Sequence, residues 1–271
     1  MSGKTVLLHA EQGFGDTIQF VRYVPMLTAR GAKIVLEVPD SLMPLIGDID
    51  GVIATVIRGQ PHPPIDLHCP LMSLPLAFGT TLATIPATVP YLRAPAERIE
   101  AWRARLPASG KLRVGLVWSG KPTHRNDHNR SIAFERLAPL LAVPDIDFVS
   151  LQRDVRETDA AALRNAAAVV RLDLHRADFA DTAAIIETLD LVIAVDTAVA
   201  HLTGALAKPL WLLLPFCPDW RWMLDRTNSP WYPGAHLFRQ PRIGDWDSVI
   251  PRVAEGLASF AATRDTPVTY L

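Results

Sequence analysis

The sequence has little cysteine and no long apolar segment. Its 271 residues include only two cysteines, Cys69 and Cys217, which lie far apart and in no Cys-x-x-Cys pattern. Neither a disulfide framework nor a zinc site is therefore expected, and both thiols are expected to be buried. No apolar run approaches the length of a membrane-spanning helix, and the start, MSGKTVLLHA, lacks the apolar core of a signal peptide. We expect a cytoplasmic protein without a transmembrane segment.

The sequence also lacks an excess of charge of one sign. Lys and Arg total 27 and Asp and Glu total 28, so the formal net charge is −1. Nucleic acids and anionic membranes are therefore not expected as partners, because both favour a basic surface. Hydrophobic residues make up 49% of the chain, which is enough for a large buried core. The length predicts either two domains or one large α/β unit.

What is present is an alternation of short aliphatic runs with amphipathic segments. Runs such as TVLLHA, AKIVLEV and LDLVIAV are apolar on both faces, which is typical of parallel strands covered by helices on each side. The alternation stops from Thr80 to Pro107, where prolines bracket one short helical stretch, and then restarts. We therefore predict two α/β domains, residues 1–107 and 108–271, with a ligand cleft between them.

The first strand-to-helix loop, HAEQGFGDTIQF, ends on a carboxylate. Gly13 and Gly15 allow a tight turn and close approach of another backbone or a ligand, and Asp16 stands where a helix is expected to begin. In one interpretation Asp16 only caps that helix. In the other, it accepts a proton from an incoming hydroxyl group at the edge of the cleft. A dinucleotide-binding Gly-x-Gly-x-x-Gly loop is not supported, because position 18 is Ile18.

A second strand-to-helix loop lies in LDLVIAVDTAVAHLTGALAKP, residues 189–209. The strand brings Asp196 and Thr197 to the start of a helix of small residues, whose free N–H groups form a site for a phosphate or diphosphate. His201 lies four residues after Thr197 and hence on the same helix face. Alternatively, Asp196 is a helix cap and His201 a buried histidine with satisfied hydrogen bonds. Together the two loops predict one acid from each domain facing a single cleft.

Three further features carry weaker signals. The loop SGKPTHRNDHNR, residues 119–130, holds cations and histidines after a strand, which is typical of a solvated loop or of a phosphate-binding loop. Gln152 ends the strand DFVSLQ, where it could bond a ribose or a base, or be an ordinary strand-end residue. Trp220 and Trp222 are interpreted as packing residues, with a shelf for a nucleotide base as the alternative.

Five segments carry a resemblance to a known family. They are EQGFGDTIQFVRYVP, GLVWSGKPTHRNDHNRSI, SLQ, LDLVIAVDTAVAHLTGALAKPLWLLLP and PDWRWMLDRTNSPWYP. The chain resembles the glycosyltransferase-like domain found at the C-terminus of many bacterial tetratricopeptide-repeat proteins. That domain is similar to glycosyltransferase family 9, the lipopolysaccharide heptosyltransferases. No helical repeat precedes the segments, and since the chain begins almost directly in an expected strand, it could be the C-terminal piece of a longer protein.

The resemblance implies the GT-B fold, in which two Rossmann-like domains hold the acceptor and the nucleotide-sugar donor on either side of a cleft. The general base of the family falls on Asp16, with Gly13 and Gly15 supporting its loop. The family needs no metal or other cofactor, since the nucleotide sugar is a substrate. As in similar GT-B proteins, the final helix after Trp246 is expected to cross back to the first domain.

The second domain is expected to bind the donor. The residues expected to do so are Arg130, Gln152, Asp196, Thr197, Ala198, Val199 and His201. Arg130 corresponds best to the basic residue that neutralises the departing phosphates in the heptosyltransferases, and Lys121 is a second candidate. Ala198 stands where those enzymes usually have glycine, so the identity of their donor does not transfer to this chain.

These observations predict a metal-independent, inverting glycosyltransferase. It would move a sugar from a nucleotide-diphosphate donor to a hydroxyl group of a glycan, lipid-linked or protein acceptor. A second hypothesis is a nucleotide-sugar-binding or scaffold domain without turnover, which Ala198 favours and the pair Asp16 and Asp196 disfavours. A sugar-nucleotide epimerase on the same fold is a third hypothesis, disfavoured because it would need additional acids and histidines in the cleft.

Overall fold

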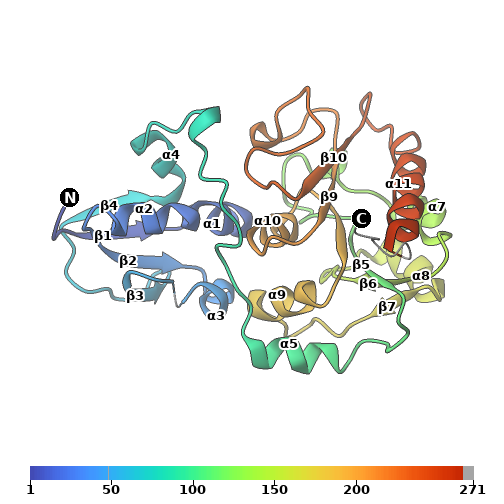
Figure 1. Cartoon of the computed structure of the whole chain (residues 1–271), viewed down its shortest axis with the longest axis horizontal. Helices are drawn as coiled ribbons and strands as arrows, with labels where there is room; N and C mark the ends of the chain where they lie inside the picture. Colours follow the sequence, from blue (N-terminus) through green and yellow to red (C-terminus); the bar gives the residue numbers. More distant parts are fainter. Residues whose placement is uncertain (48, 265–271) are drawn as a thin grey trace, which may run out of the picture.

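The computed structural model describes residues 1–47 and 49–264 and contains two β-sheets. They follow one another along the long axis of the molecule (Figure 1). The first sheet contains, in spatial order, β3 (Val52–Ile57), β2 (Lys33–Val38), β1 (Thr5–His9) and β4 (Leu67–Pro70). The second contains β10 (Ala235–Arg239), β9 (Leu210–Leu214), β8 (Leu191–Val195), β5 (Leu112–Val117), β6 (Ile146–Ser150) and β7 (Val169–Arg171). Every pairing between these strands is parallel, which confirms the predicted α/β class.

Helices connect the strands and cover the sheets. They are α1 (Phe14–Phe20), α2 (Val24–Thr28), α3 (Met43–Ile46), α4 (Leu74–Ala77), α5 (Ala96–Arg103), α6 (Asp127–Arg130), α7 (Ala138–Leu141), α8 (Glu157–Asn165), α9 (Phe179–Glu187), α10 (Ala198–Ala205) and α11 (Val249–Arg264). Short 3-10 turns are η1 (Val21–Tyr23), η2 (Asp40–Leu42), η3 (Leu71–Ser73), η4 (Leu82–Thr84), η5 (Phe134–Leu137) and η6 (Trp220–Trp222). All five residues of β8 are buried, and because the strand is covered on both faces, all five are apolar.

The strand order of the second sheet creates a switch point between β5 and β8. Strands β5, β6 and β7 extend toward one edge of the sheet, and β8, β9 and β10 toward the other. In doubly wound sheets a ligand binds outside the carboxyl ends of the two central strands. Val117 of β5 pairs with Ala194 of β8, so the loops that follow these strands begin side by side.

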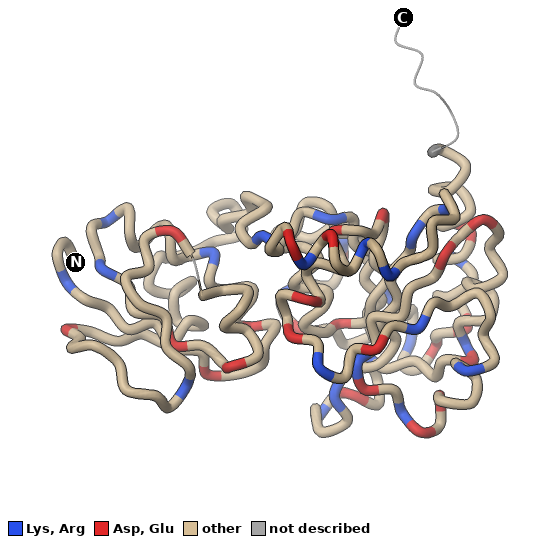
Figure 2. The backbone as a smooth tube through the Cα atoms, turned by 90° about the horizontal axis from the view of Figure 1, so that it is seen from below, with Lys and Arg blue, Asp and Glu red and all other residues tan. Residues whose placement is uncertain are grey.

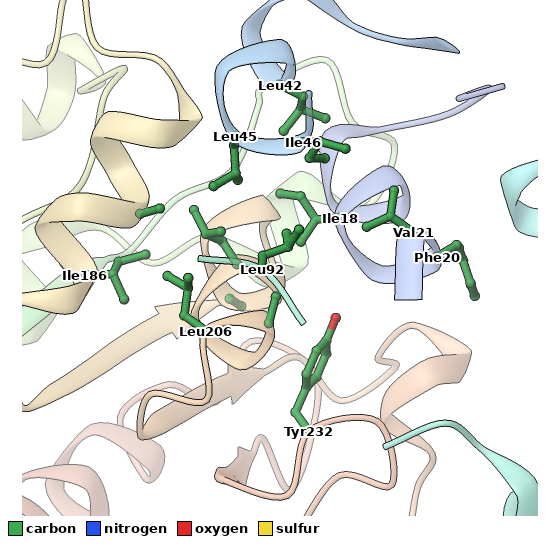
Figure 3. Packing of buried hydrophobic residues seen from close by; sticks show 14 of the residues in the cluster. Ile18, Phe20, Val21, Leu42, Leu45, Ile46, Leu92, Ile186, Leu206 and Tyr232 are labelled. Atoms are coloured by element: carbon green, nitrogen blue, oxygen red, sulfur yellow. The ribbon is translucent and has the colours of Figure 1, made fainter. Parts of the chain in front are cut away.

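One continuous apolar core joins the two sheets. Helix α1 packs against α10, and buried residues of both helices belong to one cluster with residues of α3 and α9. Figure 3 shows this contact, in which Ile18 and Leu45 from the first half lie near Ile186 and Leu206 from the second. Burial of apolar area is the main favourable term in such packing. The two halves are therefore held together by their shared core.

The proline-rich segment between the sheets is anchored on the second half. The Tyr91 N–H donates to the carbonyl oxygen of Ala205 at the end of α10, at 3.0 Å. Helix α5 packs on α9, where the Trp102 indole donates to Asp181 at 3.0 Å. The boundary proposed at residue 107 falls between the two sheets, but α5, which precedes it, has its packing partner in the second half.

The last helix covers the second sheet. Val253 and Leu257 of α11 are buried in a cluster with residues of β5, β6 and β8, and the Phe260 ring lies 5.9 Å from that of Trp211 on β9. Figure 1 places α11 on the side of this sheet away from the first half. As far as Arg264, the expected crossing back to the first domain is therefore not found, because the apolar face of the helix is already covered by the second sheet.

The surface is mixed in charge and carries one of the two thiols. Positions of Lys and Arg and positions of Asp and Glu are mixed over both halves (Figure 2). Cys69 is partly buried and Cys217 is exposed, and both are free. The expectation of a buried thiol was therefore wrong for Cys217, which lies in the loop after β9, and was met only in part for Cys69, which lies in β4.

A buried arginine ties the two halves together. Arg22 is 5% exposed and donates to the carbonyl oxygens of Gln19 at 2.9 Å and Trp231 at 2.8 Å. It also donates to the Tyr91 hydroxyl at 2.9 Å, and its guanidinium lies 4.8 Å from the centre of the Tyr232 ring. Neutral oxygens and aromatic ring faces thus stabilise the guanidinium charge. These groups come from the first half, the connecting segment and the second half.

We expect Arg22→Met to destabilise the interface. The substitution keeps much of the apolar volume but leaves buried carbonyl groups without a donor, so the free energy of unfolding should fall by about 2 to 4 kcal/mol. Chemical denaturation measures this change. The control is Arg30→Met, which removes an exposed arginine whose guanidinium lies 4.2 Å from the Phe78 ring. Equal losses in the two variants would contradict the role of Arg22.

Candidate functional site

Two buried hydroxyl groups lie at the switch point of the second sheet. Ser119 follows β5 and Thr197 follows β8, and neither side-chain oxygen has a hydrogen-bond partner among the described residues. Thr197 is the extended residue that precedes α10, and its side chain does not cap this helix. The first N–H groups of a helix lack intrahelical partners and form its positive end. The switch point therefore offers unpaired polar groups and a favourable potential for an anion.

Arg130 lies over the same strand end. It belongs to α6, and its Nη1 donates to the carbonyl oxygen of Asp196 at 2.7 Å. Gly120 allows this placement, because a Cβ there would collide with the guanidinium. Lys121 follows in an exposed turn. The structure thus brings Arg130 to the start of α10 and leaves Lys121 in solvent.

Asp196 is a partly buried acid in this cluster, and 16% of its side chain is exposed. Burial raises the pKa of its carboxyl group to about 6, against the opposing influence of the Trp222 indole and of the cations Arg130 and Arg221. The His201 Nε2 lies 3.9 Å from Asp196 Oδ1. Asp196 is therefore poised to be partly protonated near neutral pH in the free protein.

His201 has a structural environment. Its Nδ1 shares a 2.9 Å hydrogen bond with the Tyr232 hydroxyl, and its ring stacks on the buried Trp222 at 5.3 Å. Burial lowers the pKa of His201 well below its ordinary value, so the ring is neutral. Trp222 packs in the core, whereas Trp220 is 57% exposed.

The first loop brings α1 against α10. Gly15 lies so close to the second half that a Cβ would be 2.6 Å from His201 Cδ2 and 3.5 Å from the Ala198 Cα. Gly13 is the residue that caps α1, and Asp16 is the third residue of that helix, with Oδ2 accepting from the Gly13 N–H at 2.8 Å. Asp16 therefore takes part in capping α1 as the third residue of a capping box, but it is not the N-cap residue, because the helix begins two residues earlier than expected.

Asp16 points across the interface, toward a residue that the sequence analysis passed over. Its Oδ1 pairs with Nη2 of Arg221, which lies in η6 of the second half. The same guanidinium donates from Nε to Gln19 Oε1 at 2.5 Å and from Nη1 to Asp219 Oδ1 at 2.8 Å. The signal for Arg221 was a cation between two tryptophans, in the segment WRW, which was interpreted only for its rings.

A cavity of about 410 Å³ opens beside the switch point, at the carboxyl ends of β6 and β7. Its lining includes Gln152, Arg153, Arg171, Asp173 and His175. The Gln152 side chain is engaged internally, since Oε1 accepts from the N–H groups of Trp118 and Ser119 and Nε2 donates to the carbonyl oxygens of Ser119 and Asp154. Gln152 therefore shapes the wall of this cavity by joining the ends of β5 and β6.

The comparison with known proteins finds one curated relative, and no protein-family model matches the chain. The relative is Protein FlbA of Caulobacter vibrioides, 26% identical over 287 aligned positions that cover 97% of this chain. The match covers 48% of FlbA, so this chain spans about half the length of that protein.

Several solved structures share the architecture. A glycosyl transferase of family 9 from Veillonella parvula aligns with a TM-score of 0.64 and 10% identity, covering 97% of each chain. The ADP-heptose lipopolysaccharide heptosyltransferase II of Escherichia coli aligns with a TM-score of 0.61 and 15% identity, covering 98% of this chain and 100% of that one. The iron-containing dodecameric glycosyltransferase TibC of enterotoxigenic E. coli aligns with a TM-score of 0.59 and 10% identity, covering 98% of this chain and 78% of that one.

These likenesses establish the fold. The chain has the GT-B fold of family 9 glycosyltransferases, as its sequence resemblance predicted. TibC contains iron, whereas residues 1–47 and 49–264 of this chain hold no group of three or more His, Cys, Asp or Glu side chains placed to bind a metal ion. No helix within these ranges is both long and apolar enough to cross a bilayer. The association with tetratricopeptide repeats stays a prediction.

We expect Asp196→Asn to stabilise the free protein, and more so at pH 7.5 than at pH 4.5. The folded state holds the Asp196 proton more tightly than the unfolded chain, so it binds more protons between pH 3.8 and about 6 and loses stability as the pH rises through that window. Above the window the cost is about 3 kcal/mol, which asparagine does not incur. Thermal unfolding of both proteins at the two pH values measures the difference in melting temperature between Asp196→Asn and the wild type.

The matched control is Asp247→Asn, which changes a carboxylate that is 80% exposed. Its effect on the melting temperature should be small at both pH values. If the difference in melting temperature between Asp196→Asn and the wild type stays constant or narrows as the pH rises, burial does not raise the pKa of Asp196.

Proposed function

We propose that the chain is a metal-independent, inverting glycosyltransferase that uses a nucleotide-diphosphate sugar. The observation that carries this proposal is that the buried hydroxyl groups of Ser119 and Thr197 have no hydrogen-bond partner within residues 1–47 and 49–264. They lie at the switch point, next to the start of α10 and to Arg130. Buried polar groups without partners are rare and call for a ligand or a water molecule. A diphosphate supplies acceptor oxygens to the hydroxyl and N–H groups and negative charge to the guanidinium.

The nucleoside would occupy the neighbouring cavity at the ends of β6 and β7. A volume of about 410 Å³ is suited to a base and a ribose, and its wall carries carboxylates and guanidinium groups that can bond their edges. The heptosyltransferase II with this fold is named for an ADP-heptose donor, so ADP-sugars are the first ligands to test here.

In the proposed reaction Asp16 is the general base. It takes the proton of an acceptor hydroxyl group, and the oxygen attacks the anomeric carbon on the face opposite the diphosphate. The bond from that carbon to the diphosphate breaks, and its electron pair leaves with the nucleoside diphosphate. Arg130 and the first turn of α10, residues 197–199, stabilise the charge that develops on the leaving group. Because these groups supply the positive charge, no metal ion is needed in this scheme.

The alternative is a nucleotide-sugar-binding domain without turnover. Two observations favour it, since Ala198 replaces a glycine of the heptosyltransferases and since both Asp16 oxygens are already engaged, by Gly13 and by Arg221. The two functions share the donor site and differ only at Asp16. Ligand binding and turnover must therefore be measured separately.

A thermal-shift panel of ADP-, UDP- and GDP-sugars tests the donor site. A donor at about 100 times its dissociation constant stabilises the fold by about 2.7 kcal/mol, which raises the melting temperature of a chain of this size by roughly 5 to 10 °C. Arg130→Gln should abolish most of that shift, whereas Arg136→Gln, a change at a half-exposed arginine of the same domain, should preserve it. The absence of a shift with every donor would refute a nucleotide-sugar site.

Asp16→Asn separates catalysis from binding. Asparagine can still accept the Gly13 N–H but cannot take a proton, so turnover or donor hydrolysis should fall roughly 10²-fold or more while the donor dissociation constant changes little. The control is Asp66→Asn at the opposite end of β1, where Asp66 also accepts a backbone N–H, from Thr5 at 2.8 Å, and pairs with a cation, Lys4 at 2.9 Å. Full turnover by Asp16→Asn would remove the catalytic role and leave the binding-domain alternative.

A further inference from the structure

The segment that carries Arg221 is built to present it at the interface. The Asp219 carboxylate accepts from the Arg221 backbone N–H at 3.1 Å and from its Nη1 at 2.8 Å, so both the turn and the side chain are fixed by one acid. Met223, which ends the turn, adopts a positive φ of 54°, a conformation that costs free energy for a residue with a side chain. Arg221 is 6% exposed. A surface arginine would need none of these constraints.

Each nitrogen atom of the Arg221 guanidinium has an acceptor, and two of the three acceptors lie on α1 of the first half. Nη2 pairs with Asp16 and Nε donates to Gln19 Oε1 at 2.5 Å, one helical turn apart on the same face. The plane of the guanidinium fixes the angle between these bonds, which a flexible ammonium group does not do. Arg221 therefore holds the direction in which the Asp16 carboxylate points.

Without this contact, Asp16 would have a different set of partners. Its Oδ2 is held by the Gly13 N–H, but Oδ1 has Arg221 as its partner in the described structure. The other free N–H groups in the first turn of α1 and solvent would then compete for Oδ1. A general base must lie within hydrogen-bond reach of the proton that it abstracts, so its direction affects its efficiency.

We propose that Arg221 is the positioning residue of Asp16, which rests on the proposed transferase function. It directs Oδ1 across the interface toward the donor site, and because it comes from the second half, Asp16 is oriented only while the two halves are in contact. Orientation of the base is thereby coupled to assembly of the donor site and the acceptor domain. Arg221 acts through Asp16 and does not itself take part in the bond changes.

A double-mutant cycle on turnover tests this role. Arg221→Gln should lower kcat by about 10- to 100-fold with little change in donor affinity, since misplacement of a catalytic group costs on this scale. In the Asp16→Asn background the same change should have little further effect, because no base remains to be positioned. Arg221→Lys, which keeps the charge but not the planar geometry, should fall between Arg221→Gln and the wild type.

The control is Arg242→Gln, at an arginine whose side chain is 83% exposed, and it should leave kcat unchanged in both backgrounds. A merely structural Arg221 would give equal fold-losses in the wild-type and Asp16→Asn backgrounds, and that result would overturn the proposal. So would an unchanged kcat in Arg221→Gln. If Arg221→Gln does not fold, Arg221→Lys takes its place. A loss of kcat in the wild-type background that disappears in the Asp16→Asn background supports the proposal, and equal losses in both backgrounds, or no loss in the wild-type background, overturn it.

A crystal structure of Arg221→Gln gives a readout that does not depend on turnover. We expect the Asp16 carboxylate to rotate away from the second half while the packing of α1 on α10 is retained. An unchanged carboxylate would overturn the proposal even if turnover falls. If the wild type turns over no nucleotide sugar, the proposed function fails, and the crystal structures still decide whether Arg221 sets the direction of Asp16.

Discussion

The contact between α1 and α10 determines how the two halves of the molecule sit against each other. It exists because Gly15 has no side chain, since a Cβ there would be 2.6 Å from the His201 ring. This contact extends the apolar core from one sheet to the other, so the relative placement of the halves is set by close packing. The same contact brings the first helix of one half to the edge of the second sheet where the candidate site lies. Packing and the candidate site therefore have one origin.

Charges buried at this interface are arranged by their partners. Arg22 contacts neutral oxygens and aromatic ring faces of three segments, and among residues 1–47 and 49–264 it forms no ion pair with a carboxylate. Arg221 meets two acids, one from each half. Within the described part of the chain, no Lys or Arg side chain forms an ion pair with the Asp196 carboxylate, and the loss of solvation on burial raises its pKa. The interface thus contains two kinds of buried charge. Arg22 stays charged and joins three segments through hydrogen bonds, whereas the raised pKa of Asp196 allows its carboxyl group to change protonation state.

Much of the fold and of the site followed from local patterns. Uninterrupted apolar runs identify strands covered on both faces, and the residues after them lie at one edge because all the strands are parallel. This is why Asp196, Thr197 and Arg130 could be grouped before their positions were known. The placements of α5 and α11 could not be obtained in this way. An amphipathic helix specifies that it must cover an apolar surface, but not which surface, and both helices pack on the second half.

The α/β class, the two parallel sheets, the proline-rich connection and the two loops that carry Asp16 and Asp196 could be predicted from local patterns, because each depends on neighbours within a few residues. The long-range contacts could not: Gln152 joins two strand ends, His201 is a buried partner of Tyr232, and Arg221 pairs with Asp16. Arg221 and Asp16 are 205 positions apart in the chain. No local periodicity or propensity relates such residues, and their pairing follows from the packing of two separately formed units.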